Sequence, residues 1–238
     1  MQEQFLRTRM LLGEEAMERL SRAHVAVFGL GGVGSWCAEA LARSGVGELT
    51  LVDHDDVGET NLNRQAQALH STLGLPKTEA MARRIRDIAP DCVLHLLPAR
   101  YTADERESFF LVRYDYVADA IDTVSCKLDL IETCLARDIP ILSALGTGNK
   151  LDPSLFRVTD ISKTEGCPLA RVIRKELRHR GIDHHKVVFS PEMARESDQC
   201  ETPPPGRRSV PASAPWVPPV AGFLMAGEIV RDLTGISL

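Results

Sequence analysis

The chain has 238 residues, of which 44% are hydrophobic and 26% are charged, and its formal net charge is −5. This composition is typical of a globular protein with a sizeable core. The acidic balance excludes bulk electrostatic binding of nucleic acid but allows a local basic patch. The chain contains neither an apolar run long enough to cross a membrane nor a signal-peptide pattern in its polar start, so we expect a cytoplasmic protein with no membrane partner.

Strands and helices alternate along the first part of the chain. The apolar run HVAVFG and the later run ELTLVD are typical of buried strands, and SWCAEALARSG between them has helical spacing. The same alternation continues with a helix opened by Pro76 (76–89), strands over 92–97, 114–122 and 139–144, and a helix over 125–138. This pattern predicts an α/β fold, with a Rossmann-like, mostly parallel sheet and helices on both faces.

The pattern changes after about residue 150. We expect a strand over 155–161, a basic helix over 167–181, a strand over 186–190, a mobile proline-rich loop over about 194–215 and a closing helix over 218–235. No internal repeat and no clean boundary interrupts the chain. The sequence therefore predicts one domain over 1–238, with a core over 1–160 and a C-terminal extension over 161–238.

The turn between the first strand and the first helix reads GLGGVG. Gly29, Gly31 and Gly34 fit the dinucleotide fingerprint G-x-G-x-x-G, and Gly32 is an additional glycine. Glycines here let a phosphate approach the backbone at the positive end of a helix, and Asp53 ends the next strand, where an acid accepts hydrogen bonds from ribose hydroxyls. These residues alone fit NAD and ATP equally well.

Two downstream cations favour ATP. Arg64 lies in NLNRQ, and Lys77 stands at the start of the helix opened by Pro76. A triphosphate carries more charge than a dinucleotide and benefits from cations that stabilise the departing pyrophosphate. Solvated surface charge is the structural alternative for both residues.

The segment DAID supplies two carboxylates at the end of a predicted strand, which is the edge where open α/β sheets bind ligands. Asp122 is the candidate for holding Mg²⁺ against phosphate oxygens, and Asp119 is the candidate structural residue. A helix cap is the alternative role for an aspartate at this place.

Taken together, GLGGVGS, the strand end at Asp53, NLNRQ, Lys77 and DAID resemble the ubiquitin-activating-enzyme-like (ThiF/MoeB/HesA) superfamily of adenylating enzymes. The resemblance implies a homodimer with ATP and Mg²⁺ in each subunit. It implies that ATP is bound by Gly29, Gly31, Gly32, Gly34, Asp53, Asn61, Asn63, Arg64 and Lys77. It also implies catalytic roles for Arg64, Lys77, Asp122 as the magnesium-linked acid, and Arg7, which would reach the neighbouring subunit's ATP. An exposed helix charge is the alternative for Arg7.

Cysteine spacing separates the branches of that superfamily. Activators of sulfur-carrier proteins usually have two CxxC pairs that bind zinc, whereas the six cysteines of this chain are scattered, so we expect free thiols and no structural zinc. Longer segments such as DAIDTVSCKLDLI, GTGNKLDP and VTDISKTEGCPLARVIRKELRHRGI instead resemble the tRNA threonylcarbamoyladenosine dehydratase branch.

That resemblance implies an ATP-dependent enzyme of the adenylate-forming ligase type, which dehydrates N6-threonylcarbamoyladenosine in tRNA to a cyclic form. The threonine carboxylate would be activated as an acyl-adenylate, and the adjacent carbamoyl group would close the ring. The alternative is an adenylyltransferase that activates the C-terminal Gly-Gly of a ubiquitin-like sulfur-carrier protein. An NAD oxidoreductase is disfavoured because no His or Tyr-Lys pair is evident as the acid for hydride transfer.

A tRNA partner is supported by the basic segment. Helical spacing puts four cations on one face: Arg171, Arg174, Lys175 and Arg178. Such a face can contact phosphates, and Arg207 and Arg208 in the proline-rich loop could add contacts; a solvated helix is the alternative. Cys167 precedes this helix, where a thiol can become reactive, and some relatives work beside a cysteine desulfurase. Two alternatives stay open for Cys167: it carries a persulfide and works with a sulfur-acceptor partner, or it is an inert thiol.

Overall fold

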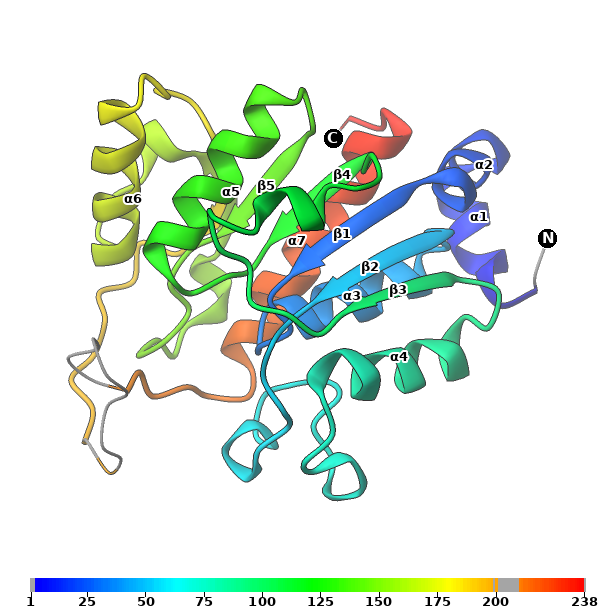
Figure 1. The fold of residues 1–238 in the computed structure, drawn as a ribbon, viewed down its shortest axis with the longest axis horizontal. Helices are drawn as coiled ribbons and strands as arrows, with labels where there is room; N and C mark the ends of the chain where they lie inside the picture. The colour runs from blue at the N-terminus through cyan, green and yellow to red at the C-terminus, as the bar shows by residue number, and fades with distance from the viewer. Residues whose placement is uncertain (1–2, 199, 201–209, 238) are drawn as a thin grey trace.

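A computed structural model describes residues 3–198, 200 and 210–237. It shows a seven-stranded sheet in the order β3-β2-β1-β4-β5-β7-β6 (Figure 1). The strands are β1 His24–Phe28, β2 Glu48–Val52, β3 Val93–Leu97, β4 Tyr116–Asp119, β5 Ile141–Ala144, β6 Arg157–Asp160 and β7 Lys186–Phe189. All neighbours are parallel except β6, which runs antiparallel to β7. The predicted α/β fold with a mostly parallel sheet is confirmed.

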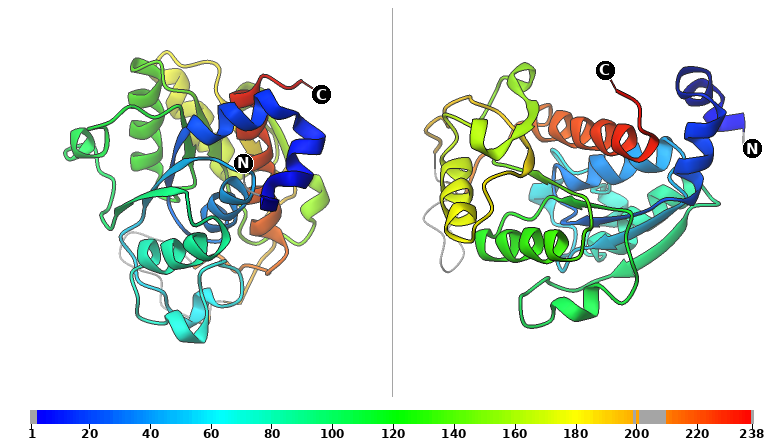
Figure 2. Two further views of the ribbon diagram at one scale, coloured as in Figure 1. Left: turned by 90° about the vertical axis from the view of Figure 1, so that its right-hand side faces the viewer. Right: turned by 90° about the horizontal axis from the view of Figure 1, so that it is seen from above.

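Helices cover both faces of the sheet (Figures 1 and 2). They are α1 Leu6–Leu12, α2 Glu14–Arg22, α3 Gly34–Arg43, α4 Lys77–Ile88, α5 Val124–Ala136, α6 Pro168–His179 and α7 Val217–Thr234. Buried side chains of α2, α3, α4 and α7 form one core cluster, and those of α5 and α6 form another. Within the described residues, no helix is long and apolar enough to span a membrane.

Strand β1 shows why the sheet is buried on both sides. All of its residues are buried. Val25 and Val27 pack into the cluster with α3, α4 and α7, whereas Ala26 and Phe28 pack into the cluster with α5 and α6. Because side chains alternate between the faces of a strand, a strand covered on both faces consists of consecutive apolar residues. This is the pattern that predicted the strand.

The C-terminal part of the chain joins the same core. Strand β7 lies between β5 and β6, and α7 packs along α3 with Met225 and Ile229 fully buried. Gly222 lets the two helices approach closely, because a Cβ there would lie 2.4 Å from the carbonyl oxygen of Val33. Helix α7 thereby brings its first turn, which contains Pro218, beside the glycine turn that precedes α3.

Candidate active site

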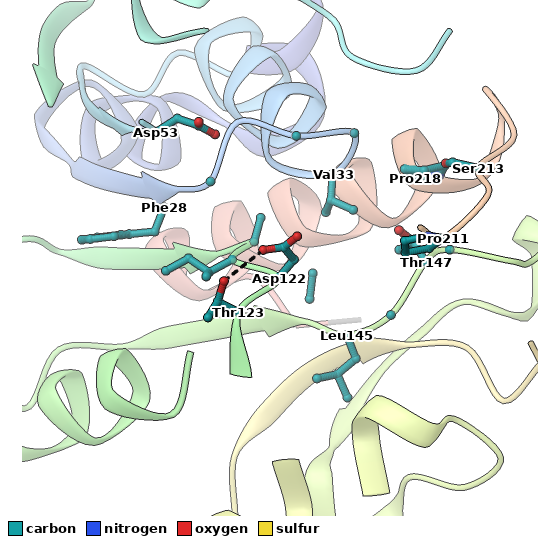
Figure 3. Close-up of a pocket in the computed structure, with 18 of the residues that line it drawn as sticks. Phe28, Val33, Asp53, Asp122, Thr123, Leu145, Thr147, Pro211, Ser213 and Pro218 are labelled. Atoms are coloured by element: carbon teal, nitrogen blue, oxygen red, sulfur yellow. Dashed lines mark hydrogen bonds between the residues drawn. The ribbon is translucent and has the colours of Figure 1, made fainter. Parts of the chain in front are cut away.

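A cavity of about 620 Å³ lies at the edge of the sheet where β1, β2, β4 and β5 end. Its wall combines the glycine turn, the segments after β2, β4 and β5, the start of α4 and the chain before α7 (Figure 3). The carboxyl edge of an open parallel sheet is the usual ligand site of such folds, and this volume suits a nucleotide-sized ligand.

Two glycines of the turn allow close backbone packing. Gly29 has a φ of +89°, and a Cβ there would lie 2.8 Å from the carbonyl oxygen of Ala120 at the end of β4. Gly34 begins α3, and a Cβ there would lie only 1.8 Å from the carbonyl oxygen of Gly29. Gly34 is not part of the described cavity wall. Its requirement for glycine therefore comes from helix–strand packing, while Gly29 both turns the chain and borders the cavity.

The other two glycines border the cavity. A Cβ at Gly31 would meet no atom within 4 Å, so this position is open for a ligand. A Cβ at Gly32 would lie 2.9 Å from Cβ of Pro218 and 3.3 Å from Cγ of Arg64. The extra glycine of GLGGVG is therefore explained at least in part by the contact with the first turn of α7.

Asp53 connects the glycine turn to the end of β2. Its side chain is 8% exposed, Oδ2 accepts a hydrogen bond from the Leu30 amide at 2.6 Å, and Oδ1 accepts one from the Asp55 amide at 2.9 Å. A carboxylate has about four acceptor sites, so these two bonds leave capacity for ligand hydroxyls. Asp53 thus orders the turn and also lines the cavity.

Lys77 is the first residue of α4 and lines the cavity with a side chain that is only 7% exposed. Its Nζ lies 2.7 Å from Oδ2 of Asp55 and 3.8 Å from Oδ1 of Asp53. The alternative of a solvated surface charge is therefore wrong for Lys77. Asp55, which the sequence analysis did not single out, provides its main carboxylate partner, and its position two residues after a strand-ending aspartate was the available signal.

Arg64 lines the cavity between the glycine turn and α7. One of its guanidinium nitrogens, Nη1, donates to the carbonyl oxygen of Thr60 and to Oδ1 of Asn63, both at 2.8 Å. The backbone oxygen of Arg64 accepts a hydrogen bond from the indole of Trp36 in α3 at 2.9 Å. Both the backbone and the side chain of Arg64 are therefore held in place at the cavity.

The two asparagines of NLNRQ differ in position. Asn61 lines the cavity, and its Oδ1 accepts a hydrogen bond from the Gly58 amide at 3.1 Å. Asn63 is outside the described wall, and its Nδ2 donates to the carbonyl oxygen of Ser213 at 2.9 Å. Asn63 thus connects this segment to the chain before α7, and its predicted contact with the nucleotide stays a prediction.

The two aspartates of DAID lie in opposite environments. Asp119 ends β4, is fully buried, and binds Nζ of Lys127 at 2.6 Å. Asp122 is exposed and lines the cavity, where it extends toward the glycine turn (Figure 3). The Thr123 hydroxyl donates to Oδ1 of Asp122 at 3.3 Å. Asp119 is thus a structural residue, whereas the carboxylate of Asp122 lies at the cavity.

Lys150 and Cys167 form the far side of the cavity. Lys150, which the sequence analysis missed, is 3% exposed, and its Nζ donates to the carbonyl oxygens of Ser190, at 3.2 Å, and of Glu192. Burial lowers the pKa of Lys150, and the nearby Cys167 and Glu192 oppose this shift. Cys167 caps the start of α6 and is 4% exposed. All six cysteines are free thiols, as predicted.

The predicted mobile loop contributes to the cavity wall. Of residues 194–215, the structure describes 194–198, 200 and 210–215, and Arg207 and Arg208 lie outside the described residues. Pro211 and Ser213 line the cavity (Figure 3). Asn149 holds residues 210–215 in place. Its backbone N–H donates to the carbonyl oxygen of Ala212 at 2.8 Å, and its side-chain Oδ1 accepts from the backbone N–H of Ala212 at 2.7 Å.

Two other groups of predicted site residues lie away from the cavity wall. Arg7 is exposed on α1, at the edge of the sheet where β1 begins (Figure 1). On α6, Arg171, Lys175 and Arg178 are exposed, but Arg174 is not equivalent to them. Its Nη1 donates to the backbone oxygen and hydroxyl of Thr164, at 2.5 and 2.6 Å.

The sheet, the glycine turn and the cations at its carboxyl edge define a nucleotide-binding α/β protein. The chain belongs to the ThiF family, whose family model matches residues 5–237. The predicted membership of that family is thereby confirmed.

Relatives of this chain include a tRNA threonylcarbamoyladenosine dehydratase of Bacillus subtilis strain 168, which is 45% identical over 97% of this chain and 94% of the relative. Among solved structures, E. coli tRNA N6-threonylcarbamoyladenosine dehydratase, TcdA, in complex with ATP matches with a TM-score of 0.88 and 38% identity, over 98% of this chain and 94% of that one. A molybdopterin-synthase adenylyltransferase of Salmonella typhimurium is 36% identical, but over only 54% of this chain and 51% of the relative.

Proposed function

We propose that this protein is an ATP-dependent enzyme that dehydrates N6-threonylcarbamoyladenosine in tRNA to its cyclic form. The observation that carries this proposal is the likeness to dehydratases, which spans nearly the whole chain in both sequence and fold. The second candidate, an adenylyltransferase for a sulfur-carrier protein, is favoured only by relatives that align with about half of the chain.

The cavity offers partners for each part of ATP. Phosphates would lie on the glycine turn, where the N-terminus of α3 presents the positive end of its dipole. Arg64 and Lys77 would neutralise phosphate charge, and Asp53 would accept hydrogen bonds from the ribose. Because Lys77 is buried and already paired with Asp55, we expect its ammonium to be shared between that carboxylate and the phosphates.

In the proposed reaction, the threonine carboxylate attacks the α-phosphorus of ATP, the bond to pyrophosphate breaks, and an acyl-adenylate forms. The adjacent carbamoyl group then attacks the activated carbonyl carbon and loses a proton, and AMP leaves with one oxygen of the former carboxylate. The protein mainly positions the reactants and neutralises charge, so no side-chain nucleophile is required.

The donor set at Asp122 fits Mg²⁺. This ion prefers oxygen ligands, retains several waters and is commonly held by one or two carboxylates together with substrate phosphates. Asp122 offers an exposed carboxylate at the cavity, opposite the glycine turn, with the Thr123 hydroxyl beside it. When bound, Mg²⁺ would neutralise charge on the phosphate oxygens, and Asp122 would hold it there.

We further propose that the active form is a homodimer in which Arg7 reaches the neighbouring subunit's ATP. Arg7 is exposed and stands apart from the cavity wall of its own chain, which is compatible with action on another subunit. Mixing two inactive variants, Arg7→Ala and Lys77→Ala, tests this: each mixed dimer would contain one intact site. Recovered activity is expected. No recovery would show that Arg7 acts within its own chain, and an Arg7→Ala variant that is active by itself would show that Arg7 has no role in the reaction.

Incubation with ATP, Mg²⁺ and tRNA that carries threonylcarbamoyladenosine tests the main proposal. We expect the nucleoside to lose the mass of one water after gentle digestion, and a heavy-oxygen label in the threonine carboxylate to appear in AMP. Unchanged tRNA in the presence of protein that binds ATP would refute the dehydratase function. ATP–pyrophosphate exchange only with a carrier protein ending in Gly-Gly would establish the second candidate.

Two earlier expectations stay predictions. A persulfide on Cys167, supplied by a cysteine desulfurase, requires access to a thiol that is 4% exposed. The cytoplasmic location likewise stays a prediction, in keeping with a tRNA substrate.

A further inference from the structure

A second group of metal-binding side chains lies at the edge of the sheet opposite the cavity. His24 begins β1, Glu48 begins β2 and His95 is in the middle of β3. One ligand atom from each of these residues lies within 4.8 Å of the other two. None of the three lines the cavity.

The pairing of the strands places this group on one face of the sheet. His24 is the register partner of Glu48, and His95 is the register partner of Thr50, two residues further along β2. Residues two apart in a strand point to the same face, so the four side chains are neighbours. Nδ1 of His24 lies 3.5 Å from Oε1 of Glu48, and Nε2 of His95 lies 2.5 Å from the same oxygen.

Thr50 and Glu48 lie on two sides of the His24 ring. Nε2 of His24 lies 2.8 Å from the hydroxyl oxygen of Thr50, and Nδ1 lies 3.5 Å from Oε1 of Glu48. Nδ1 is therefore the nitrogen that faces Glu48. A metal ion bound at Nδ1 would leave the ring proton on Nε2, where the Thr50 hydroxyl can accept it.

We propose that His24, Glu48 and His95 bind a divalent transition-metal ion such as Zn²⁺. Two imidazoles and a carboxylate suit this ion, and Zn–N and Zn–O distances of about 2.0–2.2 Å place tetrahedral ligand atoms about 3.3 Å apart. The 3.5 Å between His24 and Glu48 is close to that separation. The side chain of His95 is 47% exposed, so it can rotate away from the oxygen it now contacts to complete the site.

The contact between Nε2 of His24 and the Thr50 hydroxyl fits a general feature of metal sites, in which a ligating imidazole donates its other N–H to a fixed acceptor. A fourth position would remain for water, because His95 is at the surface. The earlier expectation of no structural zinc was drawn from cysteine spacing and does not bear on a site built from imidazoles. The ion would join the starts of β1 and β2 to β3.

The described residues contain one other group with suitable donors, Asp53, His54 and Asp55 in the cavity. It has a single imidazole, and Nζ of Lys77 lies 2.7 Å from Asp55 and 3.8 Å from Asp53. A lysine ammonium between two of the three donors disfavours a transition metal there. The opposite edge of the sheet is therefore the better site.

Titration of the full chain with Co²⁺, followed by visible absorption, tests this proposal. We expect one equivalent to give the intense bands of a tetrahedral site and to be displaced by Zn²⁺. His95→Ala and Glu48→Gln change exposed or half-buried side chains and should each weaken binding by more than about ten-fold. Circular dichroism and ATP binding would verify that both variants are folded.

Two matched control variants test whether the Co²⁺ absorption bands come from this group of residues. His184→Ala removes an exposed histidine that faces a single carboxylate, Asp160, at 3.4 Å, and His54→Ala removes the imidazole of the cavity group. Both should bind Co²⁺ as the unsubstituted chain does. The proposal is overturned if the unsubstituted chain gives no tetrahedral spectrum, if His95→Ala retains it, or if His54→Ala abolishes it.

Discussion

An aspartate at the end of β4 and an aspartate in the cavity beside it have opposite environments and roles. Asp119 and Asp122 are three positions apart. Asp119 is fully buried, with Lys127 at 2.6 Å and the Ile121 amide at 3.1 Å from its oxygens. Asp122 is exposed at the cavity, beside the Thr123 hydroxyl. The first carboxylate is committed to the fold, and the second is accessible to a ligand.

This difference teaches that burial, rather than residue type, separates the roles of these two aspartates. A buried charge requires a partner, because taking it out of water is expensive unless another charge and hydrogen bonds compensate. Lys127 is itself 1% exposed, so the two charges depend on each other. An exposed carboxylate has no such dependence, and replacing it should change chemistry while leaving stability intact.

The largest effect is expected at the buried pair. Asp119→Asn would leave the ammonium of Lys127 buried without a countercharge, and we expect a loss of about 3–5 kcal/mol in the free energy of unfolding, measured with urea. Replacing both residues with apolar ones of similar size, Asp119→Leu with Lys127→Met, should recover most of that loss. If Asp119→Asn alone is as stable as the unsubstituted chain, Asp119 is not required for stability, and the proposed difference between the two aspartates is wrong.

Asp122 provides the opposite test. Asp122→Asn should lower the rate of ATP-dependent dehydration by about 100-fold, in line with the loss of one group that stabilises charge in a transition state. Its free energy of unfolding should stay within about 0.5 kcal/mol of that of the unsubstituted chain, because the side chain is exposed. Full activity would show that Asp122 has no role at the phosphates, whatever its position.

The buried region also predicts a pH dependence. His185 is buried beside Ser143, with Nε2 at 2.8 Å from the hydroxyl oxygen. Burial, assisted by the charge of Lys127, lowers the pKa of His185 to about 3 from 6.5. The unfolded chain therefore binds a proton below pH 6.5 that the folded chain does not accept until about pH 3.

Stability contributed by this group is full above pH 6.5 and falls as the pH drops toward about 3, by up to about 1.4 kcal/mol per pH unit. Urea unfolding at several pH values would measure this slope. His185→Gln, which retains hydrogen-bonding groups but does not titrate, should show a shallower slope over the same range. Equal slopes for the two proteins would mean that His185 is not the group responsible.

Local patterns were enough to predict most of the fold. Apolar runs and helical spacing placed the strands and the helices from α3 onward within a few residues, because a sheet covered on both faces demands such runs. The strand expected over 114–122 is shorter, Tyr116–Asp119, since the chain leaves the sheet at the buried aspartate and turns along the cavity. The order of strands, with β7 inserted between β5 and β6, depends on distant pairing that no local pattern encodes.

Site residues could be predicted where a sequence motif indicates a function. They were harder to predict where the position of a side chain depends on packing between distant segments. Lys77 and Asp122 line the cavity as expected, whereas Asn63 and Gly34 lie outside its described wall and make packing contacts within the chain.

Lys150 could not be placed at the cavity from the sequence, because its position depends on contacts with Ser190 and Glu192, about 40 residues further along the chain. The group of His24, Glu48 and His95 could not be predicted for the same reason, because strand pairing brings together residues that are distant in the sequence.

The smallest effect is expected from substitutions on α6. This helix also has one charged side chain that is hydrogen-bonded within the protein and others that are exposed to solvent. Arg174 donates to Thr164, whereas Arg178 is exposed one turn later. If this face contacts tRNA phosphates, Arg178→Ala should weaken tRNA binding a few-fold and reduce its salt dependence by about one charge. Arg174→Ala should lower stability by about 1 kcal/mol through the loss of its hydrogen bonds, with a smaller effect on tRNA binding. Binding measured at several salt concentrations would separate the two, and an unchanged salt dependence in Arg178→Ala would place the tRNA on another surface.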